Sequence, residues 1–221
     1  MKSQLDSLRP LTATQVAAIR RLFRGDDLEF GYASNAIEGS QLTLRETQVV
    51  IEQGITIAGK PLQDHIDAVN GAKAVELMRA IVDSDAPLSS STVLALHACA
   101  LGGDDDRGGR VRTHNVQING STYAPPPWPA VVDGFERIFE DYERQRKIEH
   151  PVLVGADMHH RLVSVHPFAD GNGRTGRLLL NAHLMNRATL RSSSSRRIGS
   201  HTTVLFRKPM PATFEGSGRS Y

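Results

Sequence analysis

The sequence of 221 residues has very little cysteine, few aromatic residues and no long apolar run. Its single cysteine, Cys99, excludes an internal disulfide bond and suits a reducing compartment. The longest apolar stretch, Val93 to Leu101, contains His97, and no cationic N-terminus followed by an apolar segment opens the chain. We therefore expect neither a membrane span nor a secretory signal, and we expect a cytoplasmic protein.

The charge is unevenly distributed along the chain. The net charge is +2 at pH 7, but residues 188–221 hold six Lys or Arg and one acidic residue, a balance of +5 that leaves −3 for the rest. The basic character therefore comes from the tail, and the body of the chain gives no electrostatic reason to bind nucleic acid. With 39% apolar and 23% charged residues, the composition is that of a globular protein with one ordinary domain.

Apolar residues recur at helical spacing through most of the chain. Thr12 and Thr43 each stand three residues before Gln or Glu, which is the spacing of a capping box at the start of a helix. The patterns predict helices over 12–23, 28–37, 43–53, 61–83, 89–101, 128–146 and 150–165 and after 177. In the helix that begins at Trp128, we expect the inward face to consist of Val132, Phe135, Ile138, Phe139 and Tyr142.

One segment favours β-structure. The runs 115–118 and 121–124 flank Asn119-Gly120, which is the strongest short signal for a hairpin turn. A two-stranded ribbon is marginally stable alone, so we expect it to lean on the domain, with one free edge able to accept a partner strand. The fold class is therefore mainly α with one β-hairpin.

Most of the chemistry lies between His166 and Arg177, which read His-Pro-Phe-Ala-Asp-Gly-Asn-Gly-Arg-Thr-Gly-Arg. A glycine-rich loop that leads into a helix directs unpaired N–H groups and the positive end of the helix dipole at one point, which suits a phosphate. Arg174 and Arg177 are three residues apart and can reach the same anion. Asp170 suits Mg²⁺, and His166 can take a proton near neutral pH. Together these groups are the set needed for transfer from a nucleotide.

The motif meets every position of the signature His-x-Phe-x-(Asp/Glu)-Gly-Asn-Gly-Arg-x-x-Arg, so residues 28–187 resemble the Fic family. The resemblance implies a helical domain that transfers AMP from ATP to a protein hydroxyl. It implies His166 as the base, Asp170 as the Mg²⁺ ligand and Phe168 as a buried anchor. It also implies that the nucleotide phosphates are bound by Gly171, Asn172, Gly173, Arg174, Thr175, Gly176 and Arg177.

A second motif precedes the signature. Ser34 and Glu38 are four residues apart and share a helix face, which by itself more often means two solvent-facing side chains. The pattern (Ser/Thr)-x-x-x-Glu-(Gly/Asn), near 28–39, also resembles the inhibitory helix of Fic proteins. There the glutamate pairs with the second signature arginine, here Arg177, and ATP binds in a pose unsuited to transfer. The resemblance therefore implies inhibition within the chain.

The resemblance identifies the hairpin with the Fic flap, residues 113–127, which docks the backbone of a target protein beside the acceptor hydroxyl. The Arg112-Thr113 segment before it and the three prolines after it also match the family. The residues expected to dock the target are Val116, Gln117, Ile118 and Asn119.

The chain departs from the family after Arg187. Residues 188–221 lack helical periodicity and are typical of a disordered or loosely attached tail, whereas Fic proteins usually continue with a Gly-Tyr-Pro-Pro turn and further helices. One hypothesis is a shifted reading frame, because codons can be chosen for residues 188–197 such that the neighbouring frame spells Gly-Tyr-Pro-Pro-Val-Val-Ile-Lys-Ser-Glu. Resequencing the gene tests this. Residues 1–27 form a separate N-terminal helical segment in this interpretation.

Two other functions stay open. The same site is suited to the reverse reaction, removal of AMP from a modified protein with Glu38 orienting water, or to moving another phosphate-linked group. Alternatively, the protein is a non-catalytic Fic-like binding module. A metal cluster of His159, His160 and His166 is disfavoured, because adjacent histidines on a helix point in different directions. The sequence leaves the target protein open, and also whether the chain forms a homo-oligomer.

Overall fold

The computed structural model describes residues 27–84, 87–103 and 105–186, and over these ranges the chain is helical without any β-strand. The mainly α fold class is therefore confirmed. A helix at 27–37 is followed by α3 (Leu44–Gln53), α4 (Leu62–Asp83), α5 (Ser90–Leu101), the 3₁₀ turn η1 (Trp128–Ala130), α6 (Val131–Ile148), α7 (Pro151–Val165) and α8 (Asn172–Asn186). The expected helix over 12–23 and the tail at 188–221 lie outside the described residues.

Local sequence explains where several helices begin and end. Thr43 Oγ1 accepts a hydrogen bond from Glu46 N at 3.2 Å, and Glu46 Oε2 accepts one from Thr43 N at 2.7 Å, so the predicted capping box opens α3. Gly54 ends α3 in a left-handed conformation, with φ of 66°. Ser89 caps α5, and Pro151 stands in the first turn of α7, where its missing N–H is not needed.

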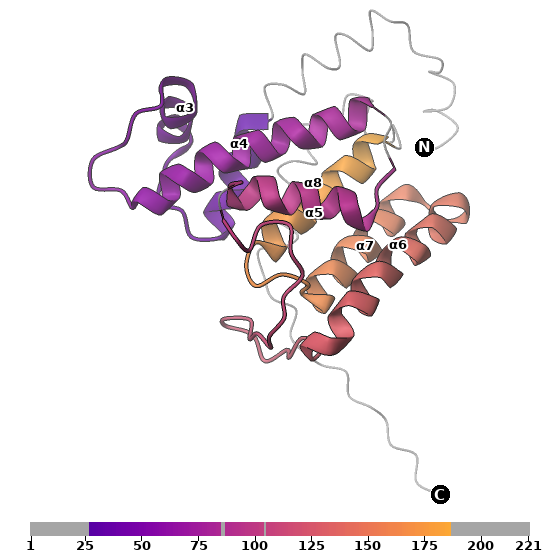
Figure 1. Ribbon diagram of the computed structural model, residues 1–221. Helices are drawn as coiled ribbons and strands as arrows, with labels where there is room; N and C mark the ends of the chain where they lie inside the picture. The colour runs from indigo at the N-terminus through magenta and orange to yellow at the C-terminus, as the bar shows by residue number, and fades with distance from the viewer. Residues whose placement is uncertain (1–26, 85–86, 104, 187–221) are drawn as a thin grey trace, which may run out of the picture.

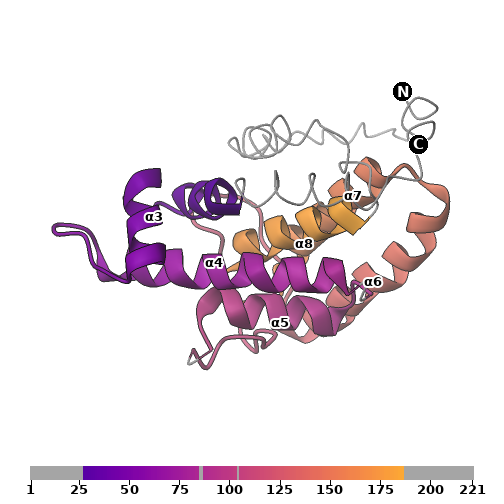
Figure 2. The ribbon, with the colours of Figure 1, turned by 90° about the horizontal axis from the view of Figure 1, so that it is seen from above.

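The helix α8 lies at the centre of the bundle. It packs against α4, α5 and α7, and most of its residues are buried. Figures 1 and 2 show α4 and α5 side by side, with α6 and α7 as a second pair at the other end of the domain. None of the helices in the described part of the chain has the length and apolarity needed to cross a membrane.

Phe168 connects the signature loop to the core. Its side chain is fully buried, stacked on the ring of His97 in α5 at a centroid distance of 3.7 Å and edge-on to Phe135 in α6 at 5.8 Å. The expected role of Phe168 as a buried anchor is therefore confirmed. The inward face of α6 is as expected apart from its first position. Val132 is exposed, and Val131, four residues before Phe135, is buried in its place.

The predicted pair of strands, 115–118 and 121–124, does not form a ladder, although the turn between them is present. Ser121 N donates to Ile118 O at 3.1 Å, and Gly120 has the positive φ, 73°, that the turn requires. The arms on either side make no strand pairing. Each arm would have only the other as a neighbour, and most of their residues are exposed, so little free energy holds two strands together. We call residues 113–127 the flap loop; Figure 1 shows it along the lower edge of the domain.

Candidate active site

The signature loop joins the end of α7 to the start of α8. His166 is the C-cap of α7 and has φ of 51° and ψ of 59°, a left-handed conformation that is uncommon for a residue with a side chain. Pro167 disfavours helical backbone at His166, which is why α7 stops there. Such a strained residue persists only where the surrounding structure holds it, and residues of this kind cluster at functional sites.

The imidazole of His166 is held in the form that a base requires. Its Nδ1 lies 3.3 Å from the carbonyl oxygen of Val163, a contact that places the proton on Nδ1 and leaves the Nε2 lone pair available. Burial lowers the pKa of His166, the hydrogen bond to Val163 opposes this, and the charge of Arg112 lowers the pKa further, while the charges of Asp170 and Glu38 raise it. The ring is therefore neutral near pH 7 and able to accept a proton.

The loop itself is shaped by Asn172 and Gly171. The side-chain amide of Asn172 accepts from Phe168 N at 2.9 Å and donates to Phe168 O at 2.8 Å, so it bridges the loop and does not face outward. Gly171 has φ of 75°, and a Cβ there would lie 2.5 Å from Leu101 Cδ1. Only glycine combines this backbone conformation with so close a neighbour.

His97 of α5 uses both ring nitrogens. Gly109 N donates to Nδ1 at 3.0 Å, which leaves the proton on Nε2, 3.0 Å from the carbonyl oxygen of Asp170. Burial lowers the pKa of His97, in keeping with a neutral ring. This histidine therefore fixes the backbone of Asp170 from the side of α5.

Arg177 is bound by the helix at 27–37. Its Nη2 donates to Glu38 Oε1 at 2.6 Å and to Ser34 O at 3.0 Å, and its Nε donates to Ser34 Oγ at 2.8 Å. The Arg177 side chain is only 8% exposed. Burial lowers the pKa of Arg177, and the charge and hydrogen bond of Glu38 oppose that shift. The contact that the resemblance implied between Glu38 and Arg177 is present in the structure.

The carboxylate of Glu38 lies over the first turn of α8. A Cβ on Gly173 would lie 2.6 Å from Glu38 Oε1 and 3.0 Å from Arg177 Nη1, so glycine is what allows this approach. Free N–H groups and the positive end of the helix dipole favour an anion at such a position. Glu38 therefore supplies a negative charge where the sequence predicts a phosphate.

Arg174 is also held by carboxylates. Its Nη1 donates to Asp67 Oδ1 of α4 at 3.1 Å and its Nη2 to Asp170 Oδ2 at 3.3 Å. Its Nε is buried without an acceptor among the described residues, so Arg174 retains a donor for an additional anion. Thr175 and Gly176 lie on the buried side of α8, where a Cβ on Gly176 would meet the ring of His159 at 3.1 Å. Gly176 therefore allows α8 to pack closely against α7.

Asp170 fits the role of a magnesium ligand shared with phosphates. Its side chain is 51% exposed, and Oδ1 accepts from Gly171 N at 2.6 Å while Oδ2 faces Arg174. The described residues contain no group of three or more His, Cys, Asp or Glu arranged to hold a metal ion. A single exposed carboxylate suits Mg²⁺, which is commonly bound by one or two carboxylates together with substrate phosphates.

Residues 87–184 match the Fic/DOC family. The protein adenylyltransferase Fic of Drosophila willistoni is 33% identical over 172 residues, which is 76% of this chain and 34% of that protein. The protein adenylyltransferase fic-1 of Caenorhabditis elegans is 33% identical over 172 residues, which is again 76% of this chain and 34% of that protein. A Fic domain containing signaling protein from Bacteroides thetaiotaomicron superposes with a TM-score of 0.71 at 27% identity, over 84% of this chain and 71% of that one. This chain belongs to the Fic family.

The chain spans about a third of the length of the curated relatives that it matches. The comparison alone therefore does not transfer the activity and target of those whole proteins to this chain.

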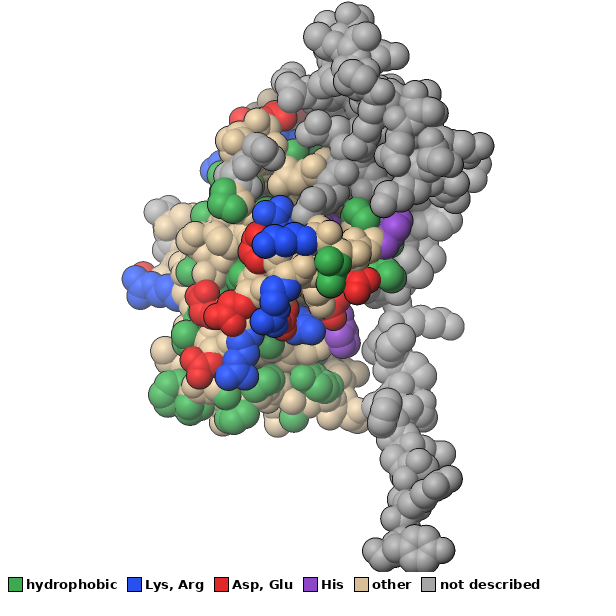
Figure 3. Space-filling model, turned by 90° about the vertical axis from the view of Figure 1, so that its right-hand side faces the viewer, with side chains coloured by type: hydrophobic (Ala, Val, Ile, Leu, Met, Phe, Trp, Pro, Cys, Tyr) green, Lys and Arg blue, Asp and Glu red, His purple; other side chains and the backbone are tan. Residues whose placement is uncertain are grey.

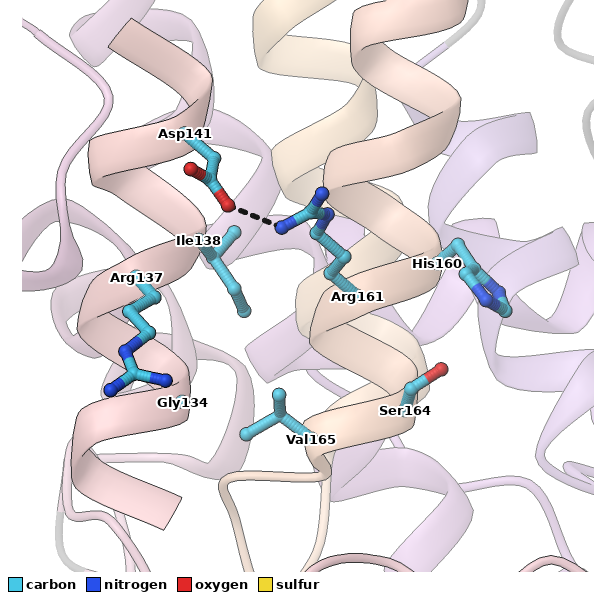
Figure 4. A pocket seen from close by; sticks show the side chains of 8 residues that line it. All are labelled: Gly134, Arg137, Ile138, Asp141, His160, Arg161, Ser164 and Val165. Atoms are coloured by element: carbon cyan, nitrogen blue, oxygen red, sulfur yellow. Dashed lines mark hydrogen bonds and ion pairs between the residues drawn. The ribbon is translucent and has the colours of Figure 1, made fainter. Parts of the chain in front are cut away.

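Tyr123 joins the flap loop to α7. Its hydroxyl donates to Ser164 O at 3.1 Å, at one end of a surface groove of about 430 Å³ that lies between α6 and α7. Figure 4 shows the groove, with Arg161 in its middle turned toward Asp141. Arg161 is also 2.8 Å from Asp157, so its charge is balanced by two carboxylates. Figure 3 shows acidic and basic side chains intermixed over the face drawn there.

The four flap residues expected to dock a target of this Fic domain lie around the turn at the tip of the flap loop. Gln117 and Asn119 are exposed, and Val116 and Ile118 are half-buried. Their backbone carries no strand partner, and apart from Ile118 O, which accepts from Ser121 N, these residues present free N–H and C=O groups.

Sequence reasoning missed two contacts at this site. Asp67 binds Arg174 across 107 residues of sequence, and no local pattern indicates such a pair. In the sequence, Arg112 stands out only as part of a family-like segment, but its buried guanidinium donates to the carbonyl oxygen of His166 at 2.8 Å. Its position beside the flap was the one available signal.

Proposed function

We propose that this protein is a Mg²⁺-dependent adenylyltransferase that moves AMP from ATP to a Ser, Thr or Tyr hydroxyl of a target protein. The observation that carries the proposal is one loop that combines a neutral, strained His166 with the anion-favouring start of α8 and with Asp170. The adenylyltransferase relatives, at about one third identity, support the same chemistry.

Each residue of the site has its own role in the proposed reaction. His166 Nε2 takes the proton of the acceptor hydroxyl, whose oxygen forms a bond to the α-phosphorus while the bond between that phosphorus and pyrophosphate breaks. The N–H groups at the start of α8, with Arg174 and Arg177, stabilise the negative charge on the phosphates. Mg²⁺ bound to Asp170 and the phosphates would supply further positive charge there.

Glu38 is proposed to inhibit this reaction from within the chain. It uses a donor of Arg177 that the outer phosphate of ATP would otherwise use, and it brings a like charge to the place where the phosphate would bind. Carboxylate and phosphate therefore compete for one guanidinium. ATP bound beside Glu38 is expected to be misplaced, and a misplaced reactant loses much of the benefit of proximity.

The test is mass spectrometry of the protein after incubation with ATP and Mg²⁺. Three chains are compared: the natural sequence, Glu38→Gly, and Glu38→Gly combined with His166→Ala. The proposal expects addition of AMP to the Glu38→Gly protein, much less to the natural chain and none to the double variant. AMP addition by the double variant at an undiminished rate would refute the assignment of His166 as base.

Removal of AMP from a modified protein is a second candidate, favoured by the place of Glu38. Its charge acts on His166 and its carboxylate lies over the start of α8, where it is able to orient a water molecule. Incubating the natural chain with an AMP-modified protein, in parallel with ATP and the unmodified protein, separates the two reactions. If neither reaction occurs and calorimetry detects no ATP binding, the Fic domain is a non-catalytic binding module.

A further inference from the structure

Arg112 is a buried cation that is bound entirely by backbone carbonyls. Its side chain donates from Nε to His166 O at 2.8 Å, from Nη1 to His114 O at 2.8 Å and from Nη2 to Pro126 O at 2.7 Å. Its own backbone N–H donates to Pro167 O at 2.9 Å. The residue is 4% exposed, and no acidic side chain among the described residues pairs with it.

A buried charge without a counter-ion is costly, so a purely structural position would more cheaply be filled by an apolar side chain. Burial accordingly lowers the pKa of Arg112, although a guanidinium remains charged in proteins. What arginine offers here is geometry. Its planar fork presents donors in three separate directions, and each direction meets a different segment of the chain.

The three segments are the two ends of the flap loop and the catalytic residue. His114 lies where the flap loop leaves the domain, Pro126 where it returns, and His166 at the end of α7. No ladder connects the two arms of the flap loop. Its base is closed by Arg112 and by one further bond, from Trp128 N to Asn115 Oδ1 at 2.9 Å.

We propose that Arg112 is a positioning residue of the adenylyl-transfer site, whose buried guanidinium clamps both ends of the flap loop to the backbone of His166. Arg112 thereby fixes the position of the acceptor hydroxyl, which the flap loop docks, relative to the base that deprotonates it. This inference rests on the proposed function for its catalytic consequence. The clamp itself is a mechanical property that can be measured without any activity.

The first experiment measures the clamp on the full chain by limited chymotrypsin digestion at the bond between Tyr123 and Ala124. The variant Arg112→Met keeps an unbranched apolar chain and removes all three donors. We expect its cleavage at this bond to be about tenfold faster than that of the natural protein, because cleavage follows local opening of the loop. Arg110→Met is the matched control, since Arg110 is exposed and its side chain makes no hydrogen bond with a described residue; it should leave cleavage unchanged.

A second variant separates the effect of the guanidinium geometry from the effect of the positive charge. Arg112→Lys keeps the positive charge but replaces three divergent donors by one ammonium group, so its loop should be cleaved nearly as fast as that of the Met variant. If the Met variant loses its helical circular dichroism, the Lys variant alone decides the question. If the folded Met or Lys variant is cleaved at the same rate as the natural protein, Arg112 does not clamp the flap loop.

The second experiment asks whether the clamp serves catalysis. In the Glu38→Gly background, transfer of label from ATP labelled at the α-phosphate to the protein itself is measured over a range of ATP concentrations. We expect Arg112→Met to lower kcat by about tenfold or more while KM for ATP changes by less than about twofold, because the nucleotide contacts are untouched. A raised KM with unchanged kcat would overturn the assignment. If the Glu38→Gly parent itself is not labelled, adenylyl transfer fails as the function, and digestion still decides whether Arg112 clamps the loop.

Discussion

The carboxylate of Glu38 and the guanidinium of Arg177, 139 residues apart in sequence, lie 2.6 Å from each other. The pair joins the turn that follows the helix at 27–37 to the second turn of α8, and Ser34 of that helix adds two further bonds to the same guanidinium. Arg177 is thus nearly buried by one helix, on the side that an outer phosphate would approach. In the proposed function, inhibition and nucleotide binding would therefore use the same side chain.

Glu38→Gly is expected to raise AMP transfer while lowering stability. The variant frees one donor of Arg177 for ATP but removes the carboxylate partner of a buried cation, and loss of such a hydrogen bond costs about 1.5–3 kcal/mol. ATP should then raise the melting temperature of the variant more than that of the natural protein, because a tighter ligand stabilises the folded state further. Thermal shift with and without ATP and Mg²⁺, beside a labelling assay, measures both effects.

The matched control for that variant is Glu29→Gly. Glu29 is exposed on the same helix and its side chain makes no hydrogen bond or ion pair with a described residue, so the change costs about 1 kcal/mol of helix propensity without touching Arg177. It should leave transfer at the low natural rate. Equal activation by Glu29→Gly would mean that loosening of the helix, and not loss of the carboxylate, releases activity.

Much of this fold is encoded locally, and the sequence predicts those parts well. The capping box at Thr43, the cap at Ser89 and the stop before Pro167 each depend on residues within one turn of the boundary. The flap ladder was wrong because Asn119-Gly120 encodes a turn, whereas strand pairing also needs neighbours that this loop lacks. The clamp of Arg112 and the pair of Asp67 with Arg174 are invisible in the sequence because their partners are brought together only by tertiary folding.

The activity of the Glu38→Gly protein should rise with pH through the pKa of His166. Burial holds that pKa below its ordinary value of 6.5, so the ring is neutral and able to act as base over a wider acid range than a solvent-exposed histidine. Transfer should therefore persist at about pH 6, where an ordinary histidine would be mostly protonated. Initial labelling rates across this range test it, and a midpoint above the ordinary value would contradict the neutral, buried ring.

Folding stability should fall as the solution is acidified below the ordinary histidine pKa. The pKa values of His97, His159 and His166 are all lowered by burial, so the unfolded chain takes up protons on these residues before the folded chain does. Their contribution to stability is complete above pH 6.5 and is lost as the pH drops through their folded pKa values. Each pKa unit of difference is worth about 1.4 kcal/mol.

Melting temperatures at a series of pH values measure this effect. In His97→Gln the melting temperature should fall less steeply at acidic pH than in the natural protein, because the variant lacks one of the buried imidazole rings. His160→Gln, at an exposed position, should leave the slope unchanged. Parallel slopes for the natural protein and His97→Gln would show that protonation of His97 does not contribute.

Gly171→Ala should disable the signature loop, and the chain contains a control for its backbone strain. A residue with a side chain at φ of 75° costs about 1–2 kcal/mol. Gly54 has a similar φ of 66° with open space around its Cβ position, so Gly54→Ala should show that cost alone. At Gly171 the new Cβ would also lie 2.5 Å from Leu101 Cδ1 and 3.3 Å from His97 Cδ2, so the loop must move away from α5. We therefore expect Gly171→Ala to lose more stability than Gly54→Ala in chemical denaturation. Gly171→Ala should also weaken ATP binding in calorimetry, whereas Gly54→Ala should not change it. Equal effects of the two variants would mean that the loop tolerates the displacement and that its contact with α5 does not shape the proposed phosphate site.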